Sequence, residues 1–165
     1  MRVQLTRLDG MLDAMLTEKR LMIQALSGVG GFTFNPIHDV EGDCGTTLAL
    51  LFETPQRVRA ALDGLHAEGV RADTPIDSGR HVYTNWEPIL KQQGAHHPGM
   101  DAYKRAEVPV EYTPDMCPNT LNVLSRTMFL YTDPTRSRAD LDALIEQTAR
   151  ETWITRVQPP DGLEL

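Results

Sequence analysis

The fold is decided by one stretch of the chain, Thr46-Thr47-Leu48-Ala49-Leu50-Leu51-Phe52-Glu53-Thr54-Pro55. Its first seven residues are nearly continuous in apolar side chains, which is typical of a strand in the middle of a sheet. Thr54 is a preferred helix N-cap residue, and Pro55 suits the first helical position because no N–H is needed there. The stretch therefore predicts a central strand that leads directly into a helix.

The helix that begins at Pro55 is expected to end at Gly69, because glycine readily adopts the backbone conformation that terminates helices. Its apolar inner face consists of Val58, Ala61, Leu62 and Leu65. Val70-Arg71-Ala72 then starts another short strand. Residues 46–73 have the length of a βαβ or split βαβ unit.

A long helix is predicted before this unit, over residues 3–27. Apolar side chains recur there at spacings of three and four, which gathers them on one side of the helix. They are Leu5, Leu8, Leu12, Met15, Leu16, Met22, Ile23 and Leu26. Three glycines between residues 28 and 31 are expected to end the helix. An apolar stripe of this length suits packing against a partner domain or subunit.

The remaining elements predict an α+β fold, with a small mixed or antiparallel sheet covered by helices. Residues 32–34 and 127–132 are expected to be strands, residues 118–126 a helix, and Ser137 the start of the last helix. Residues 74–116 are irregular, with a short helix over 86–92. A connection of this length is unusual in a compact domain and is often functional.

Composition excludes several classes of function. The 165 residues carry a net charge of −7, with 41% hydrophobic and 24% charged residues. This is typical of one globular domain, and the acidity argues against nucleic acid as a partner. No membrane span and no signal peptide are predicted. The two cysteines, Cys44 and Cys117, define no disulfide framework, so a cytoplasmic, reducing compartment is the simplest expectation.

Two patterns could bind ligands, but we favour a simpler interpretation of each. The turn Gly42-Asp43-Cys44-Gly45 could grip a phosphate, yet no helix follows it, so a plain turn before a strand is preferred. The histidines could be metal ligands together with the cysteines, but none stands at the spacing of a structural zinc site. The histidines considered are His38, His81, His96 and His97. We expect no metal site.

The usual nucleophiles lack their motifs. No Gly-x-Ser-x-Gly occurs, so a nucleophile elbow is excluded. Cys117 lies at a helix start, which can activate a thiol, but we favour a partly buried structural cysteine. The three lysines, Lys19, Lys91 and Lys104, lie on no activated-lysine pattern, and Lys19 is expected to be solvated. No catalytic residue is therefore assigned.

The segment Arg80-His81-Val82-Tyr83-Thr84-Asn85-Trp86 is dense in side chains that can form hydrogen bonds. Its aromatic residues could form the wall of a polar pocket. Aromatic residues also anchor long connections to a core. Both interpretations stay open.

Four stretches together carry a family resemblance. They are Arg2-Val3-Gln4-Leu5-Thr6-Arg7-Leu8-Asp9-Gly10-Met11-Leu12, Gly42-Asp43-Cys44-Gly45-Thr46-Thr47-Leu48, His81-Val82-Tyr83-Thr84-Asn85-Trp86 and Asp115-Met116-Cys117-Pro118-Asn119-Thr120-Leu121-Asn122-Val123-Leu124-Ser125-Arg126. Over residues 2–152 the chain resembles sugar aminotransferases of the DegT/DnrJ/StrS type, and most of all the branch that aminates an octulosonate sugar for lipopolysaccharide. The run that begins at Met116 is the most specific of the four.

The resemblance implies a fold and a division of labour. These enzymes use pyridoxal phosphate and have the aspartate aminotransferase (type I) fold. Residues 1–156 would be the C-terminal small domain, with residues 1–27 as the inter-domain helix and residues 157–165 as a frayed tail. The large domain supplies the Schiff-base lysine, the acidic partner of the pyridine nitrogen and most phosphate contacts. These groups are expected to lie outside this sequence, so the chain alone is expected neither to bind the cofactor nor to be catalytic.

The resemblance also implies a substrate and partners. The parent reaction would aminate a keto-sugar or sugar nucleotide in amino-sugar or lipopolysaccharide biosynthesis. The small domain closes over the substrate, which makes His81 and Asn85 the residues expected to line the sugar side of the pocket. The expected partners are a large pyridoxal-phosphate-binding domain or subunit and further copies of the chain. The alternative is a non-catalytic binding or regulatory module that retains the small-domain fold.

Overall fold

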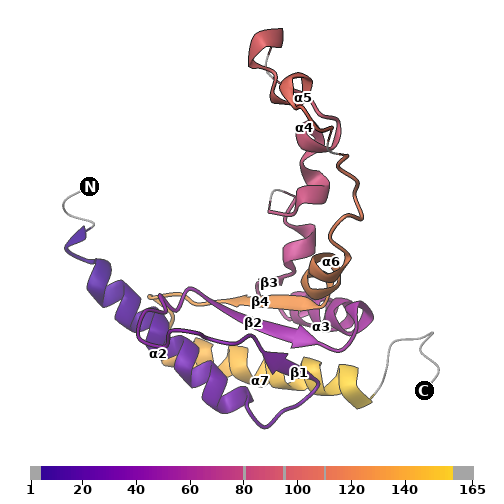
Figure 1. Ribbon diagram of the computed structural model, residues 1–165. Helices are drawn as coiled ribbons and strands as arrows, with labels where there is room; N and C mark the ends of the chain where they lie inside the picture. The colour runs from indigo at the N-terminus through magenta and orange to yellow at the C-terminus, as the bar shows by residue number, and fades with distance from the viewer. Residues whose placement is uncertain (1–4, 80, 95, 110, 158–165) are drawn as a thin grey trace.

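The structure is a computed structural model that describes residues 5–79, 81–94, 96–109 and 111–157 (Figure 1). The tail predicted to be frayed lies outside these residues from 158 onward. The chain folds as α+β, as its sequence predicts. None of the described helices is both long and apolar enough to cross a membrane.

A four-stranded sheet in the order β1-β2-β4-β3 forms the centre of the fold. Its strands are β1 (Phe32–Phe34), β2 (Thr47–Phe52), β3 (Ala72–Asp73) and β4 (Thr127–Tyr131). Every hydrogen-bonded pair is antiparallel. Since β2 and β3 both run antiparallel to β4, they are parallel to each other with β4 between them. The unit predicted over residues 46–73 is therefore a split βαβ unit, and β2 is an interior strand as expected.

Three helices cover one face of this sheet. They are α2 (Leu8–Leu26), α3 (Pro55–Ala67) and α7 (Arg138–Val157). In β2, Leu48, Leu50 and Phe52 are buried against them, whereas the residues that alternate with these three are only half-buried. The nearly continuous apolar run of β2 thus contributes side chains to both faces of the sheet, one of which is covered by helices while the other is partly exposed.

The boundaries of α3 follow from local chemistry, as predicted. The Thr54 side chain accepts a hydrogen bond from the backbone N–H of Arg57 at 3.3 Å, and Pro55 occupies the first helical position. Gly69 follows the helix with a φ of 79°, in the left-handed region that glycine tolerates best. At the last helix, the Ser137 hydroxyl accepts a hydrogen bond from the N–H of Asp140 at 3.2 Å, which confirms the predicted start.

The apolar stripe of α2 is only partly used by the core. Met22 and Leu26 are fully buried in the core, at 0% and 1% exposure. At the other end, Leu5, Leu8 and Met11 are 60%, 42% and 45% exposed. The half of the stripe nearest the N-terminus therefore remains available for another surface.

The loop over residues 39–45 packs on α2 and fixes its position. A Cβ atom on Gly45 would lie 2.5 Å from the backbone nitrogen of Leu16, so only glycine allows this close approach. Lys19 Nζ donates a hydrogen bond to Asp43 Oδ2 at 2.6 Å, and Lys19 is only 9% exposed. The prediction that Lys19 is solvated is therefore wrong, because the loop covers the helix at that point.

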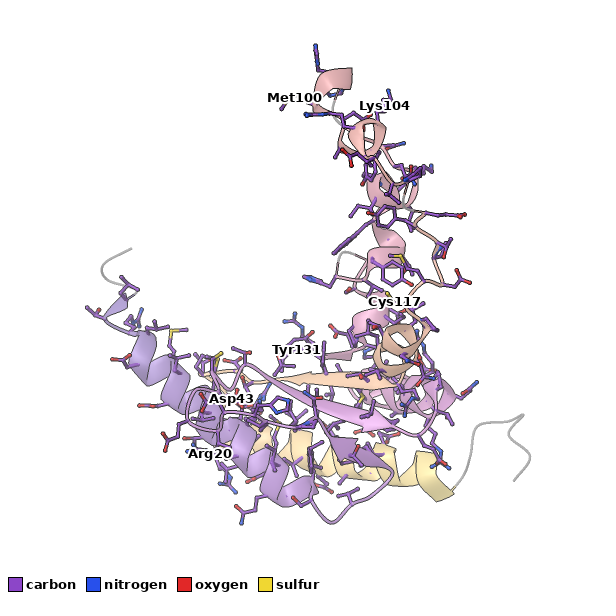
Figure 2. All side chains as sticks on the ribbon, viewed as in Figure 1. Arg20, Asp43, Met100, Lys104, Cys117 and Tyr131 are labelled. Atoms are coloured by element: carbon purple, nitrogen blue, oxygen red, sulfur yellow. The ribbon has the colours of Figure 1, made fainter. Side chains whose placement is uncertain are left out.

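Residues 74–117 form an arm that stands on the side of the sheet opposite α7 (Figure 1). It contains α4 (Glu87–Leu90) and α5 (Ala102–Arg105), with short 3₁₀ turns before α4 and between the two helices, and it returns to the body through α6 (Pro118–Ser125). Figure 2 shows Met100 and Lys104 near the far end of the arm and Cys117 at its base. The helix predicted over residues 86–92 is thus shorter than expected.

Side-chain hydrogen bonds close the base of the arm. The buried Thr74 hydroxyl donates to the Leu124 carbonyl oxygen at 3.1 Å. Tyr83 donates its hydroxyl to the Pro114 carbonyl oxygen at 2.7 Å and accepts the N–H of Cys117 at 3.1 Å. The outgoing and returning segments are therefore tied together where they leave the sheet.

Candidate functional site

The two residues expected to line a sugar pocket, His81 and Asn85, lie at the base of the arm. Both are exposed, and their backbone N–H groups donate to Ser78 Oγ at 3.2 Å and to the Val82 carbonyl oxygen at 3.0 Å. Val82, between them, is only 2% exposed. The segment thus anchors the arm through Val82, and a substrate pocket that includes His81 and Asn85 needs a second surface to complete it.

The cysteines and histidines do not converge. Within the described residues, no group of three or more His, Cys, Asp or Glu side chains could hold a metal ion. Cys44 and Cys117 are free and exposed. The predicted partial burial of Cys117 is wrong, because this residue caps α6 at the junction with the arm, where its backbone N–H and carbonyl are hydrogen-bonded but its side chain makes no cap hydrogen bond.

The turn over residues 42–45 is a structural turn, as we favoured. Asp43 Oδ1 accepts the N–H of Gly45 at 2.8 Å, and its other oxygen accepts the bond from Lys19. The hydrogen bond from the Lys19 ammonium holds the pKa of the Asp43 carboxyl below its usual value. This turn therefore secures the loop on α2 and leads into β2.

All three lysines of the chain are paired with carboxylates. The pairs are Lys19 with Asp43 at 2.6 Å, Lys91 with Glu87, and Lys104 with Asp101 at 3.6 Å. A Schiff-base lysine needs a desolvated or cationic setting, and a carboxylate partner is the opposite of a cationic one. No chemical step through pyridoxal phosphate is therefore assigned to these lysines.

A pocket of about 590 Å³ opens at one end of the sheet, where β1 begins, β2 ends and β4 begins. Phe32, Leu51 and Phe52 contribute its apolar lining. Its charged residues are Glu53, Arg57 and Arg126, which come from the β2–α3 connection, the first turn of α3 and the junction of α6 with β4. The residues that line the pocket thus come from three parts of the sequence that are distant from one another, 30–33, 51–57 and 126.

Arg126 is fixed at this pocket by two hydrogen bonds. Its Nε donates to Asn122 Oδ1 at 3.0 Å, and one terminal nitrogen donates to the Phe52 carbonyl oxygen at 2.7 Å. Its other terminal nitrogen forms no hydrogen bond with any residue in the part of the chain that the structure describes. The guanidinium is thus held in place, and its second terminal nitrogen can still donate hydrogen bonds.

Arg57 is the second cation of the pocket, and the Glu53 carboxylate neutralises its charge only weakly. Its side chain is 15% exposed, and its Nε lies 3.7 Å from Glu53 Oε2. The Glu53 side chain is 75% exposed, and this separation exceeds an ordinary hydrogen bond. A cation in the first turn of a helix is also disfavoured by the helix dipole. The pocket is therefore locally positive within a chain of net charge −7.

Sequence reasoning did not identify this pocket. Arg126 ends the most specific of the four family-like stretches, but no role was attached to it there. Arg57 had a detectable signal, since it is a cation in the first turn of a helix whose start is marked by Thr54 and Pro55. The proximity of both residues to β1 depends on the fold.

No protein-family model matches this chain, and no curated protein matches it. The fold and the site define an α+β domain with a split βαβ core, a projecting arm and an arginine-lined pocket.

Proposed function

We propose that this chain is the C-terminal portion of a pyridoxal-phosphate-dependent aminotransferase that acts on a keto-sugar or sugar nucleotide. In this proposal it works against a cofactor-binding domain or subunit that supplies the Schiff-base lysine. The four family-like stretches support the assignment.

The structural observation that carries the proposal is the exposed half of α2. Leu5, just before the helix, and Leu8 and Met11, at its N-terminal end, recur every three residues and are 42–60% exposed. The resemblance implies an inter-domain helix at this position. An apolar face on such a helix is suited to packing against the other domain.

The pairing of all three lysines supports the same division of labour. The chain would enclose the substrate, with His81 and Asn85 presented from the base of the arm, while amino transfer would take place on the other domain. No proton transfer or covalent step is assigned to residues of this chain.

A cofactor-trapping experiment tests this division. The purified chain mixed with pyridoxal phosphate and then reduced with borohydride is expected to carry no adduct on Lys19, Lys91 or Lys104 by peptide mass spectrometry. The reason is that each lysine is ion-paired with a carboxylate and lies on no activated-lysine pattern. A stoichiometric adduct on any of the three would overturn the proposal.

A second experiment tests the partner. The chain is purified together with its bound protein from its own cells, and that protein is expected to contain reducible pyridoxal phosphate. The complex is expected to convert glutamate to 2-oxoglutarate only when a keto-sugar is added. Leu8→Glu should dissociate the complex, whereas Val108→Glu, at a 74% exposed site on the arm, is the matched control. A bound protein without pyridoxal phosphate would contradict the proposal.

The alternative is a binding module without catalysis, and one observation favours it. The pocket that contains Arg57 and Arg126 is formed wholly by residues of this chain. A chain that is monomeric and binds its ligand with no second protein would support this alternative.

A further inference from the structure

We propose that the pocket at the end of the sheet binds the carboxylate group of a small organic acid, held by Arg57 and Arg126. This inference does not require the aminotransferase assignment, because every group involved belongs to this chain.

The two cations reach the pocket from different parts of the fold. Arg57 is contributed by α3 and Arg126 by the residue between α6 and β4, and both line the same pocket. The Arg57 side chain is 15% exposed and Arg126 is half-buried, so water screens the repulsion between their like charges only in part. A bound anion would relieve the repulsion.

The protein supplies too little negative charge of its own to neutralise both cations. Glu53 is the acidic residue among those that line the pocket, and its side chain is 75% exposed and 3.7 Å from Arg57. The remaining lining residues are neutral, as are Asn122 and the carbonyl of Phe52, which hold Arg126. Two arginines and one glutamate leave one net positive charge, which matches a monoanion.

Arg126 is presented to the pocket in a fixed orientation. Its Nε and one terminal nitrogen are used to fix it to the body, so that its orientation is set before a ligand arrives. A guanidinium held in this way offers planar donors, which suit the two oxygens of a carboxylate. Preorganisation also lowers the entropic cost of binding.

The size and the apolar lining of the pocket suit a small molecule. A volume of about 590 Å³ is within the range of pockets that take small molecules, and Phe32, Leu51 and Phe52 provide an apolar wall beside the charges. Such a wall suits a short carbon chain attached to the carboxylate. The Thr33 hydroxyl, on an exposed residue at the rim, can bind a further polar group.

Titration of the full chain, followed through backbone amide signals in NMR spectra, tests the inference. The probes are acetate, L-glutamate, the neutral acetamide and inorganic phosphate. Acetate and glutamate are expected to shift the amide signals of Gly30, Gly31, Leu51 and Arg126, and acetamide is expected to shift none of them. Equal shifts with acetamide would show that binding does not depend on the negative charge of the ligand and would overturn the proposal. Binding of phosphate without binding of either carboxylate would overturn it as well.

Two variants on the same helix separate a binding role from a general charge effect. Arg57→Gln is expected to weaken carboxylate binding about tenfold or more, since it removes a charged partner. Arg59→Gln is the control, because Arg59 pairs with Asp77 and does not line the pocket. It should alter binding less than twofold. Equal effects of the two substitutions would refute the assignment.

Folding does not confound this comparison. Arg57→Gln removes a cation from the first turn of a helix, where the dipole disfavours it, so thermal unfolding of the variant should occur at or above the wild-type temperature. Since the titrations use neither pyridoxal phosphate nor a second protein, their failure would leave the aminotransferase proposal unaffected, and the reverse also holds.

Discussion

Replacement of Gly45 by alanine tests how the loop over residues 39–45 positions α2. Gly45 has a φ of 68°, and an added Cβ would lie 2.5 Å from the backbone nitrogen of Leu16 and 2.6 Å from its Cα. The left-handed conformation alone costs a non-glycine residue about 1–2 kcal/mol. Relief of the clash requires the loop or the helix to move, at a further cost of about 1–3 kcal/mol.

Gly69→Ala is the matched control for this prediction. Gly69 has a φ of 79°, but an added Cβ would meet no atom within 4 Å. Its replacement should therefore carry the conformational cost without the clash. The two free energies of unfolding, measured by urea denaturation at pH 7 and followed by circular dichroism, should differ by about 1–3 kcal/mol, with Gly45→Ala the less stable.

Equal losses of stability in the two variants would refute this reasoning. They would mean that the loop does not contact the backbone of α2 closely in solution. Native tryptophan fluorescence and the slope of the denaturation curve must stay unchanged for the comparison to be valid, because a changed slope would indicate a different folded or unfolded state.

Two further predictions concern stability. Lys19→Met is expected to cost about 2 kcal/mol at pH 7, since it leaves the poorly exposed Asp43 carboxylate without its charged donor, whereas Arg20→Met at the exposed neighbouring position should cost far less. The folded-state pKa of Asp43 lies below its unfolded value, so the ion pair contributes stability above the unfolded value and loses this contribution as the pH falls. The difference in the free energy of unfolding between wild type and Lys19→Met should therefore narrow below about pH 4. A difference that stays constant in urea titrations down to pH 3 would contradict this account. Thr54→Ala should cost about 1 kcal/mol through the loss of the N-cap of α3, measured by thermal unfolding, and an unchanged midpoint would show that the cap is not needed.

The sequence predicts the parts of the fold that depend on neighbouring residues. The start of α3 follows from Thr54 and Pro55, and its end follows from Gly69, because caps and breakers act within one turn. The interior position of β2 follows from its own composition. These features require no knowledge of residues elsewhere in the chain.

Features that depend on distant contacts could not be predicted in this way. Insertion of β4 between β2 and β3 is decided by pairings across the whole arm. The burial of Lys19 depends on a loop 24 residues further along, which brings Asp43 onto α2. The pocket likewise requires β1, α3 and the start of β4 to meet, and a single sequence does not show which cationic residues will converge.

The hydrogen bond between Thr74 and Leu124 has a consequence for how this chain can change. The arm leaves and re-enters the body at one place, where this hydrogen bond joins its two ends. A change in the length of the arm should therefore hardly alter the geometry of the sheet. The entropic cost of closing a longer excursion grows only slowly with its length. Insertions and deletions between these two residues should therefore be tolerated by the body, and the arm can vary in reach while the split βαβ core stays constant.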